Sequence, residues 1–311
     1  MTVKIYSNTD VSAPPGNGVS GSLITLLDAV LVNGYGSKTA AGWTKVFAGT
    51  NIAVYRNNPL APGSSGMYLR VDDTTSNYAT VKAYKTMSDI STGTDMIPSG
   101  TPAYTNTAIY WIKSSSADTV YRPWMIVADD RTMYFNTAPN GTAPSTVSTG
   151  AIVMGAGDFD SMVPGNSWNY FIAGSMSSTW SSYTDSITYS SSNYAPGLIG
   201  RAQDLVANKQ SKFYVQPINT WSGNGSQYVD SSYTNTKVYY PGLIIENATQ
   251  ANITGSLRGV YGLAGRCAYT TWMSNAGKLP DDPTGPDMIQ FLEYDWNSNR
   301  IGAIFVRLGN W

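Results

Sequence analysis

The sequence contains no histidine and only one cysteine, Cys267, in 311 residues. Histidine is the commonest metal ligand and general base, so its absence excludes Ser-His-Asp and Cys-His catalytic arrangements and any zinc site that needs histidine. A single cysteine also excludes an internal disulfide and a zinc site built from thiolates. Several common enzyme classes are therefore excluded, and we predict no cofactor, no metal and no catalytic residue.

Charged residues are also scarce, at 13% of the chain with a net charge of −1. Such a chain has no basic field to hold phosphates, so nucleic acid is not an expected partner. No stretch approaches the roughly 20 apolar residues of a membrane span, and MTVKIYSNTD lacks the pattern of a signal peptide. We therefore expect a protein made in the cytoplasm, with no membrane partner.

Aromatic and turn-forming residues are abundant instead, with 22 Tyr, 9 Trp, 30 Gly and 16 Pro. This composition favours strands and turns over helices. It predicts a mainly β protein with antiparallel, sandwich-like sheets and long irregular loops.

One N-terminal helix is predicted over about residues 21–33. Leu23, Leu27, Val30 and Leu31 recur at the spacing that builds one apolar helical face. Ser20 or Ser22 can cap the first turn, and Asn33-Gly34 can end the helix. We expect its apolar face to pack on the hairpin that follows, 42–47 with 52–56, joined by a loop at 48–51.

Alternating or apolar runs separated by turn residues predict further antiparallel pairs. These pairs are 67–71 with 78–87, 123–128 with 131–135 around Asp129-Asp130, 151–154 with 168–173, and 288–294 with 301–308.

Composition divides the chain into three parts. Residues 1–18, with Pro14 and Pro15, predict an extended N-terminal arm. Residues 19–175 predict a helix plus antiparallel β domain, and residues 176–311 a second β-rich region packed on the first. The second region opens with a Ser- and Tyr-rich run, 174–192, that is typical of a long excursion or linker.

Four pairs of carboxylates are candidates for chemistry: Asp72/Asp73, Asp129/Asp130, Asp158/Asp160 and Asp281/Asp282. Turn chemistry explains the first two pairs. Asp158 and Asp160 are less easily explained, because alternate positions on a strand share a face and could hold a cation or act as a catalytic pair. A solvated loop is the interpretation we favour for them.

Tryptophans in polar stretches are candidates for a binding surface, whereas those inside apolar runs predict core. Trp180, Trp221 and Trp296 belong to the first kind. Such residues can stack on sugars or anchor a protein interface, and both interpretations stay open.

Several runs in one order resemble a known family: LITLLDAVLVNGYG, AGWTKVFAGTNIAVYR, MYLRVDD, KAYKTMSDISTGT and RPWMIVADDRTMYF. They are similar to structural proteins of tailed bacteriophages, usually labelled virion or constituent proteins. The similarity is strongest over about residues 20–175 and returns at LRGVYGL. It implies a place in the virion, assembled in the cytoplasm of a bacterial host.

Three functional hypotheses follow. The first is a non-enzymatic, multi-copy structural component of the head, neck, tail or baseplate that binds other virion proteins and copies of itself. Its candidate interface residues are Pro14, Pro15, Trp180, Tyr183, Trp221 and Trp311. The second is a receptor- or glycan-binding protein at the tail tip, with Trp180, Trp221 and Tyr228 facing a host saccharide. The third is a polysaccharide depolymerase that uses Asp158 and Asp160.

Overall fold

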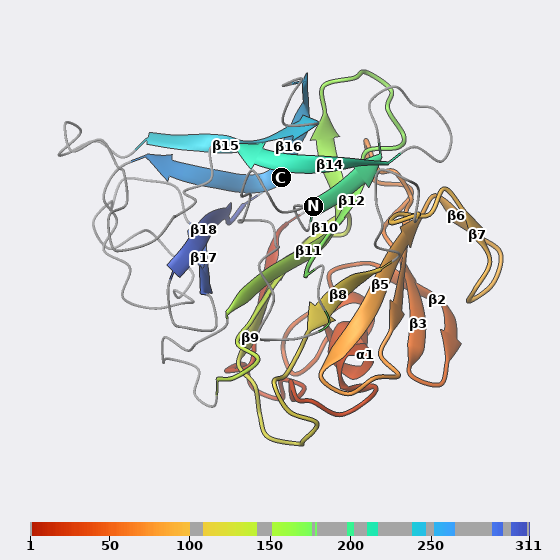
Figure 1. The fold of residues 1–311 in the computed structure, drawn as a ribbon, viewed down its shortest axis with the longest axis vertical. Helices are drawn as coiled ribbons and strands as arrows, with labels where there is room; N and C mark the ends of the chain where they lie inside the picture. Colours follow the sequence, from red (N-terminus) through yellow and green to blue (C-terminus); the bar gives the residue numbers. More distant parts are fainter. Residues whose placement is uncertain are drawn as a thin grey trace.

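The computed structural model describes residues 2–99, 108–141, 151–175, 178, 198–201, 210–216, 238–246, 252–264, 288–294, 300–309 and 311. Strands make up 48% of the structure, the sheets are antiparallel, and one of them curls into a half-barrel. The helical content is one short segment of 12 residues in this described part. The predicted fold class is therefore confirmed (Figure 1).

The helical segment consists of α1, Ser22–Leu27, which continues as a π-helical turn, η1, Asp28–Asn33. Its place and its end at Gly34 agree with the prediction, but the predicted capping is wrong. Gly21, with φ 83°, holds the N-cap position, and no side chain at that position caps the helix. The serine hydroxyls are used elsewhere: Ser20 donates to the Thr74 carbonyl and Ser22 to that of Asn17.

A five-stranded sheet lies beside this helix in the order β2-β3-β4-β5-β8. Its strands are β2 Thr44–Gly49, β3 Ile52–Arg56, β4 Tyr68–Asp72, β5 Tyr78–Tyr84 and β8 Ile109–Ile112. A two-stranded ribbon, β6 Thr86–Met87 with β7 Gly93–Thr94, follows β5. The predicted pairs β2–β3 and β4–β5 are confirmed.

The β2–β3 connection is shorter than predicted. Ala48 and Gly49 extend β2 and pair with Ala53 and Ile52, so the loop is reduced to Thr50 and Asn51. Asn51 adopts a positive φ of 55°, a conformation that asparagine tolerates better than most residues.

The larger sheet has eleven strands in the order β1-β9-β10-β11-β12-β13-β14-β15-β16-β18-β17, with an additional β11–β16 pairing. Its bounds are β1 Lys4–Ser7, β9 Trp124–Ala128, β10 Thr132–Thr137, β11 Ile152–Ser161, β12 Tyr170–Ala173, β13 Leu198–Arg201, β14 Gln210–Gln216, β15 Val238–Glu246, β16 Asn252–Ala264, β17 Met288–Tyr294 and β18 Arg300–Arg307. The predicted hairpins β9–β10 and β17–β18 are confirmed. Strands β11 and β12 also pair, but through residues 155–158, which lie beyond the predicted run 151–154; residues 152–154 pair with β10 instead.

The loop expected at Asp158 and Asp160 is instead part of β11. Phe159 between them is fully buried and pairs with Leu257 of β16, so burial of an aromatic ring holds this stretch in the sheet.

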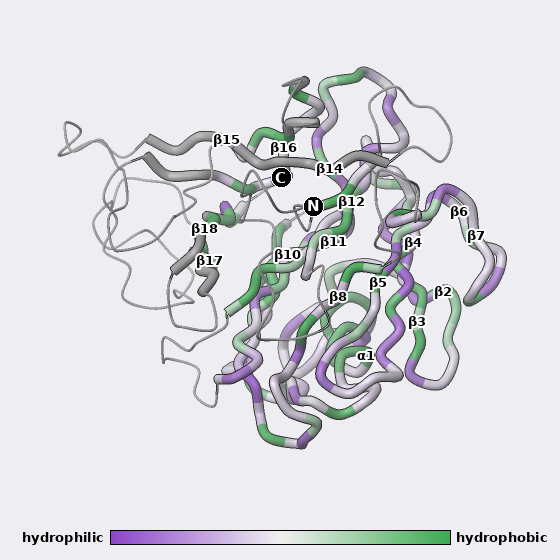
Figure 2. The backbone as a smooth tube through the Cα atoms, viewed as in Figure 1, coloured by the Kyte–Doolittle hydropathy of each residue, from purple (hydrophilic) through white to green (hydrophobic). Residues whose placement is uncertain are grey.

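The strands β9–β12 are buried on both faces. Successive side chains of a strand point to opposite sides, and here each side meets a separate hydrophobic core. Ile126 and Phe135 join a core shared with α1 and the small sheet. Val127 and Tyr134, their neighbours in sequence, join a second core on the other face, with residues of β16–β18. Figure 2 shows hydrophobic stretches along β11 and β12, which agrees with burial on both faces.

The large sheet crosses the predicted domain boundaries. Residues 4–7 of the predicted arm form β1, and Tyr6 is fully buried, so this part belongs to the sheet. The sheet also continues from β12 to β13, past residue 175. The domain division stays a prediction, and most of the Ser- and Tyr-rich run, residues 179–192, lies outside the described residues.

No helix in the described part is long and apolar enough to cross a membrane.

Candidate functional site

Three of the predicted interface residues fall within the described structure. Pro14 is half-buried, and its carbonyl accepts a hydrogen bond of 3.1 Å from Trp124 Nε1, whereas Pro15 is exposed. Trp311 is the third. Trp180, Tyr183 and Trp221, together with Tyr228 of the glycan-binding hypothesis, lie outside the described residues.

Trp311 packs against its own chain. Its ring lies 5.5 Å from the Tyr134 ring and 5.8 Å from the Arg258 guanidinium carbon, and its Nε1 donates to the Arg307 carbonyl at 2.8 Å. Gly259 gives it space, because a Cβ there would lie 2.2 Å from Trp311 Nε1. We therefore place this tryptophan at an internal contact between β10, β16 and the segment after β18.

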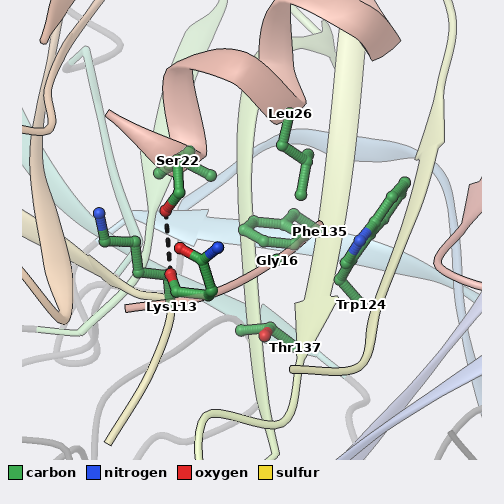
Figure 3. Close-up of a pocket in the computed structure, with 9 residues that line it drawn as sticks. Gly16, Ser22, Leu26, Lys113, Trp124, Phe135 and Thr137 are labelled. Carbon is green, nitrogen blue, oxygen red and sulfur yellow. Dashed lines mark hydrogen bonds between the residues drawn. The ribbon is translucent and has the colours of Figure 1, made fainter. Parts of the chain in front are cut away.

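A small cavity lies beneath α1, between the helix and the strands β9 and β10 (Figure 3). Gly16 and Asn17 help to line it, so the segment that follows Pro15 packs on the body of the protein. Figure 3 shows the hydrogen bond from Ser22 Oγ to the Asn17 carbonyl beside it. The cavity measures about 10 Å³, which is the smallest space that holds one water molecule and too small for a ligand.

A buried ion pair joins the helix to the small sheet. Asp73 is fully buried, one of its oxygens accepts from the Leu23 backbone N–H at 2.8 Å, and the other pairs with Lys113 Nζ. This carboxylate therefore supplies the N-terminal cap that no nearby side chain supplies. Burial raises the pKa of Asp73 and lowers that of Lys113, so each charge depends on the other.

A second buried carboxylate, Asp158 of β11, is bound by protein donors on both oxygens. Oδ1 accepts from Asn57 Nδ2 at 3.0 Å and from the Ser65 hydroxyl. Oδ2 accepts from Arg131 Nε at 3.0 Å and from the Ser65 N–H at 3.2 Å. Burial raises the pKa of Asp158, while Ser65 and Arg131 act in the opposite direction. Asp158 therefore fixes the β3–β4 loop to the large sheet.

A third buried carboxylate, Asp129 in the β9–β10 turn, is held by Arg258 of β16. The two side chains form a fork of two hydrogen bonds, at 3.0 and 2.8 Å, and the Thr132 N–H also donates to Asp129 at 2.8 Å. Burial works against the charge of Arg258, but Asp129, together with Asp160 and Tyr134, raises the pKa of the guanidinium. The sequence predicted Asp129 only as a turn residue. Nothing in the local sequence indicated that its partner is an arginine 129 residues away.

An open cleft adjoins the Asp158 cluster. It has a volume of about 370 Å³ and lies between the β3–β4 loop and the β11–β12 loop. Residues 63–64, 131, 160–161, 163–167 and 169 line it. Asp160 is on its wall with 58% of its side chain exposed, and the Arg258 Nε atom lies 3.6 Å from one carboxylate oxygen.

The geometry assigns different roles to the two carboxylates of the catalytic-pair hypothesis. Asp158 is fully buried and has protein donors on both oxygens, so it offers no free oxygen to a substrate. Asp160 alone is open to a ligand in the cleft. Within the described residues, no group of three or more acidic or cysteine side chains is arranged to hold a metal ion.

Comparisons with known proteins do not assign the chain to a family. No protein-family model matches the sequence, and no curated protein matches it.

Proposed function

We propose that this protein is a non-enzymatic structural component of a tailed bacteriophage particle, present in multiple copies and bound to neighbouring virion proteins and to copies of itself. The observation that carries the proposal is the use of its buried carboxylates. Asp73, Asp129 and Asp158 each bind protein donors on both oxygens and join segments that are far apart in sequence. Each of these three carboxylates is therefore committed to contacts within the protein, and none of the three is free for acid–base chemistry.

The resemblance to virion proteins supplies the location. Its quoted runs correspond to α1 with η1, to the strands β2–β7 and to the β9–β10 hairpin, which build most of the core between the two sheets. The resemblance therefore covers the helical segment, most of the small sheet and one hairpin of the large sheet, whereas most strands of the large sheet lie outside it. Pro14, Pro15, Trp180, Tyr183 and Trp221 remain proposed contact residues, whereas the internal packing of Trp311 argues for a role within the subunit.

Immunogold electron microscopy of purified phage particles tests the location. We expect an antibody against the full chain to label the head, neck, tail or baseplate in a regular pattern. The same antibody, adsorbed beforehand with the purified protein, is the control. Absence of label from both intact and opened particles would contradict the proposal.

The alternative function is a receptor- or glycan-binding protein. The residues first considered for it, Trp180, Trp221 and Tyr228, lie outside the described structure. Label confined to the tail tip, together with capture of the protein by host-cell envelopes, would favour this alternative over a head or neck component.

A further inference from the structure

The cleft beside Asp160 has the size and the boundaries of a binding site. Its volume of about 370 Å³ lies within the range of roughly 300–1,000 Å³ that is typical of small-ligand pockets. Its floor is held by the Arg131–Asp158 ion pair, and Arg131 also donates to the carbonyls of Pro62 and Gly63. The cleft is therefore formed between two loops that buried hydrogen bonds keep in place.

The wall of the cleft offers both donors and acceptors. Asp160 presents a largely exposed carboxylate. Ser161 Oγ accepts hydrogen bonds from the Val163 N–H at 3.1 Å and from Asn166 Nδ2 at 3.0 Å, so its own hydroxyl hydrogen is left to donate. Asn166 Nδ2 has a second hydrogen that is similarly available.

Asn169 adds an acceptor that the described part of the protein does not satisfy. Its Nδ2 donates to the carbonyls of Phe159, at 2.8 Å, and Gly63, at 3.2 Å, which fixes the orientation of the amide. Its Oδ1 is buried and has no hydrogen-bond partner among the described residues. A buried acceptor without a hydrogen-bond partner costs free energy, so a hydrogen bond from a ligand to Asn169 Oδ1 would be favourable.

Ion pairs offset most of the charge around the cleft. Arg131 is neutralised by Asp158, and the Arg258 guanidinium lies beside the exposed Asp160 carboxylate. Arg258, 3.6 Å from Asp160, is already paired with Asp129. A phosphate would meet the exposed carboxylate of Asp160, and a cation would meet the guanidinium groups of Arg131 and Arg258. Neither class of ion is suited to this site.

We propose that this cleft binds a neutral saccharide. Sugar hydroxyls both donate and accept hydrogen bonds, which matches the mixture of Asp160, Ser161, Asn166 and Asn169. The apolar face of a sugar ring finds Val163 and Pro164 on the same loop. The proposal is independent of the position of the protein in the particle, and it differs from the earlier glycan-binding hypothesis because it uses none of Trp180, Trp221 and Tyr228.

Titration of the full chain with single sugars tests the proposal. The probes are D-glucose, D-galactose, D-mannose and N-acetyl-D-glucosamine, followed by saturation-transfer NMR and by ¹⁵N shifts of the asparagine side-chain amides. We expect at least one sugar to bind and to shift the Asn166 and Asn169 amides. Asp160→Asn replaces one acceptor oxygen with a donor, and Ser161→Ala removes a hydroxyl, while the floor of the cleft is retained. Each should weaken that binding by about tenfold.

Asp89→Asn is the matched control, since Asp89 is an exposed aspartate on the β6–β7 ribbon, away from the residues that line the cleft. It should leave sugar affinity unchanged, and thermal unfolding should show that all three variants are folded. The proposal is overturned if no sugar in the panel binds, or if Asp160→Asn and Ser161→Ala bind as tightly as the unsubstituted protein. It is also overturned if inorganic phosphate or Ca²⁺ binds at these amides in preference to every sugar.

Discussion

The two main sheets are assembled in different ways. In the five-stranded sheet, β2, β3, β4 and β5 lie side by side in chain order. The eleven-stranded sheet instead also pairs β1 with β9 and β11 with β16, which are far apart in sequence. Long loops cost more conformational entropy to close than short ones. The large sheet therefore depends more on contacts that hold distant segments together.

The buried ion pairs follow the same division. Asp73–Lys113 lies within the first 113 residues and holds the start of α1 to the small sheet. Asp129–Arg258 joins the β9–β10 turn to β16. It therefore connects the part of the large sheet that contains β9 and β10 with the part that contains β16–β18. Buried ion pairs thus join segments 40 residues apart in the first case and 129 residues apart in the second, and substitutions should separate their effects.

The largest effect is expected for Arg258→Met. It leaves Asp129 buried without its counter-ion, which should lower the free energy of unfolding by roughly 3–5 kcal/mol in urea denaturation. Hydrogen exchange should accelerate first in β16 and in the β9–β10 turn. Arg70→Met is the matched control, because the Arg70–Asp72 pair is partly exposed and should cost only about 1 kcal/mol or less.

Asp129→Asn combined with Arg258→Met completes a double-mutant cycle. We expect the double variant to lose less stability than the sum of the two single variants, because no unpaired charge remains buried. If the stability losses of the two single variants add up to that of the double variant, Asp129 and Arg258 do not interact energetically.

Asp73→Ala should have the next largest effect, a loss of about 3 kcal/mol, since it removes the helix cap and leaves Lys113 buried without a counter-ion. Hydrogen exchange should accelerate in α1 and β8 and much less in β16–β18. Asp72→Ala, one residue earlier and half-buried, is the control and should cost less than about 1 kcal/mol. Equal acceleration of hydrogen exchange in both sheets after Asp73→Ala would show that the Asp73–Lys113 and Asp129–Arg258 pairs do not stabilise separate parts of the protein.

Two glycine substitutions measure the contact of Trp311 with the large sheet. Gly259 and Gly165 have nearly equal positive φ angles, 69° and 71°, but only Gly259 has neighbours within reach of a Cβ. Gly165→Ala should cost about 1 kcal/mol from backbone strain alone. Gly259→Ala should cost about 2 kcal/mol, because it also displaces the Trp311 ring. Thermal unfolding measures both, and equal losses would mean that Trp311 contributes nothing to the stability of β16.

The smallest effect is expected on the β6–β7 ribbon at low pH. Hydrogen bonds from the Ser91 N–H and from Thr92 lower the pKa of the exposed Asp89 to about 2. Because the folded-state pKa is depressed, the stabilisation is present above the ordinary value near 4 and is lost as pH falls through about 2. NMR titration of the Asp89 carboxyl measures this shift. A titration midpoint near 4 would show that the ribbon is not closed by these bonds.

Local patterns in the sequence predicted much of the fold. The spacing of Leu23, Leu27, Val30 and Leu31 located the helical segment, and turn residues between apolar runs located the main hairpins. These features depend on residues that are close in sequence, where period and turn chemistry have direct structural consequences. The β2–β3 loop was misjudged only at its ends, where two small residues continued the ladder.

The tertiary structure decided the roles of the carboxylates. Asp73 and Asp129 were predicted as turn residues and Asp158 as part of a loop, yet all three are buried in ion pairs. Their partners Lys113, Arg131 and Arg258 lie 27 to 129 residues away. The cleft was equally hidden, since its walls come from loops that the large sheet brings together. A sequence pattern reports the period of one element, whereas burial and charge pairing depend on which elements meet, and that is determined only when the whole chain packs.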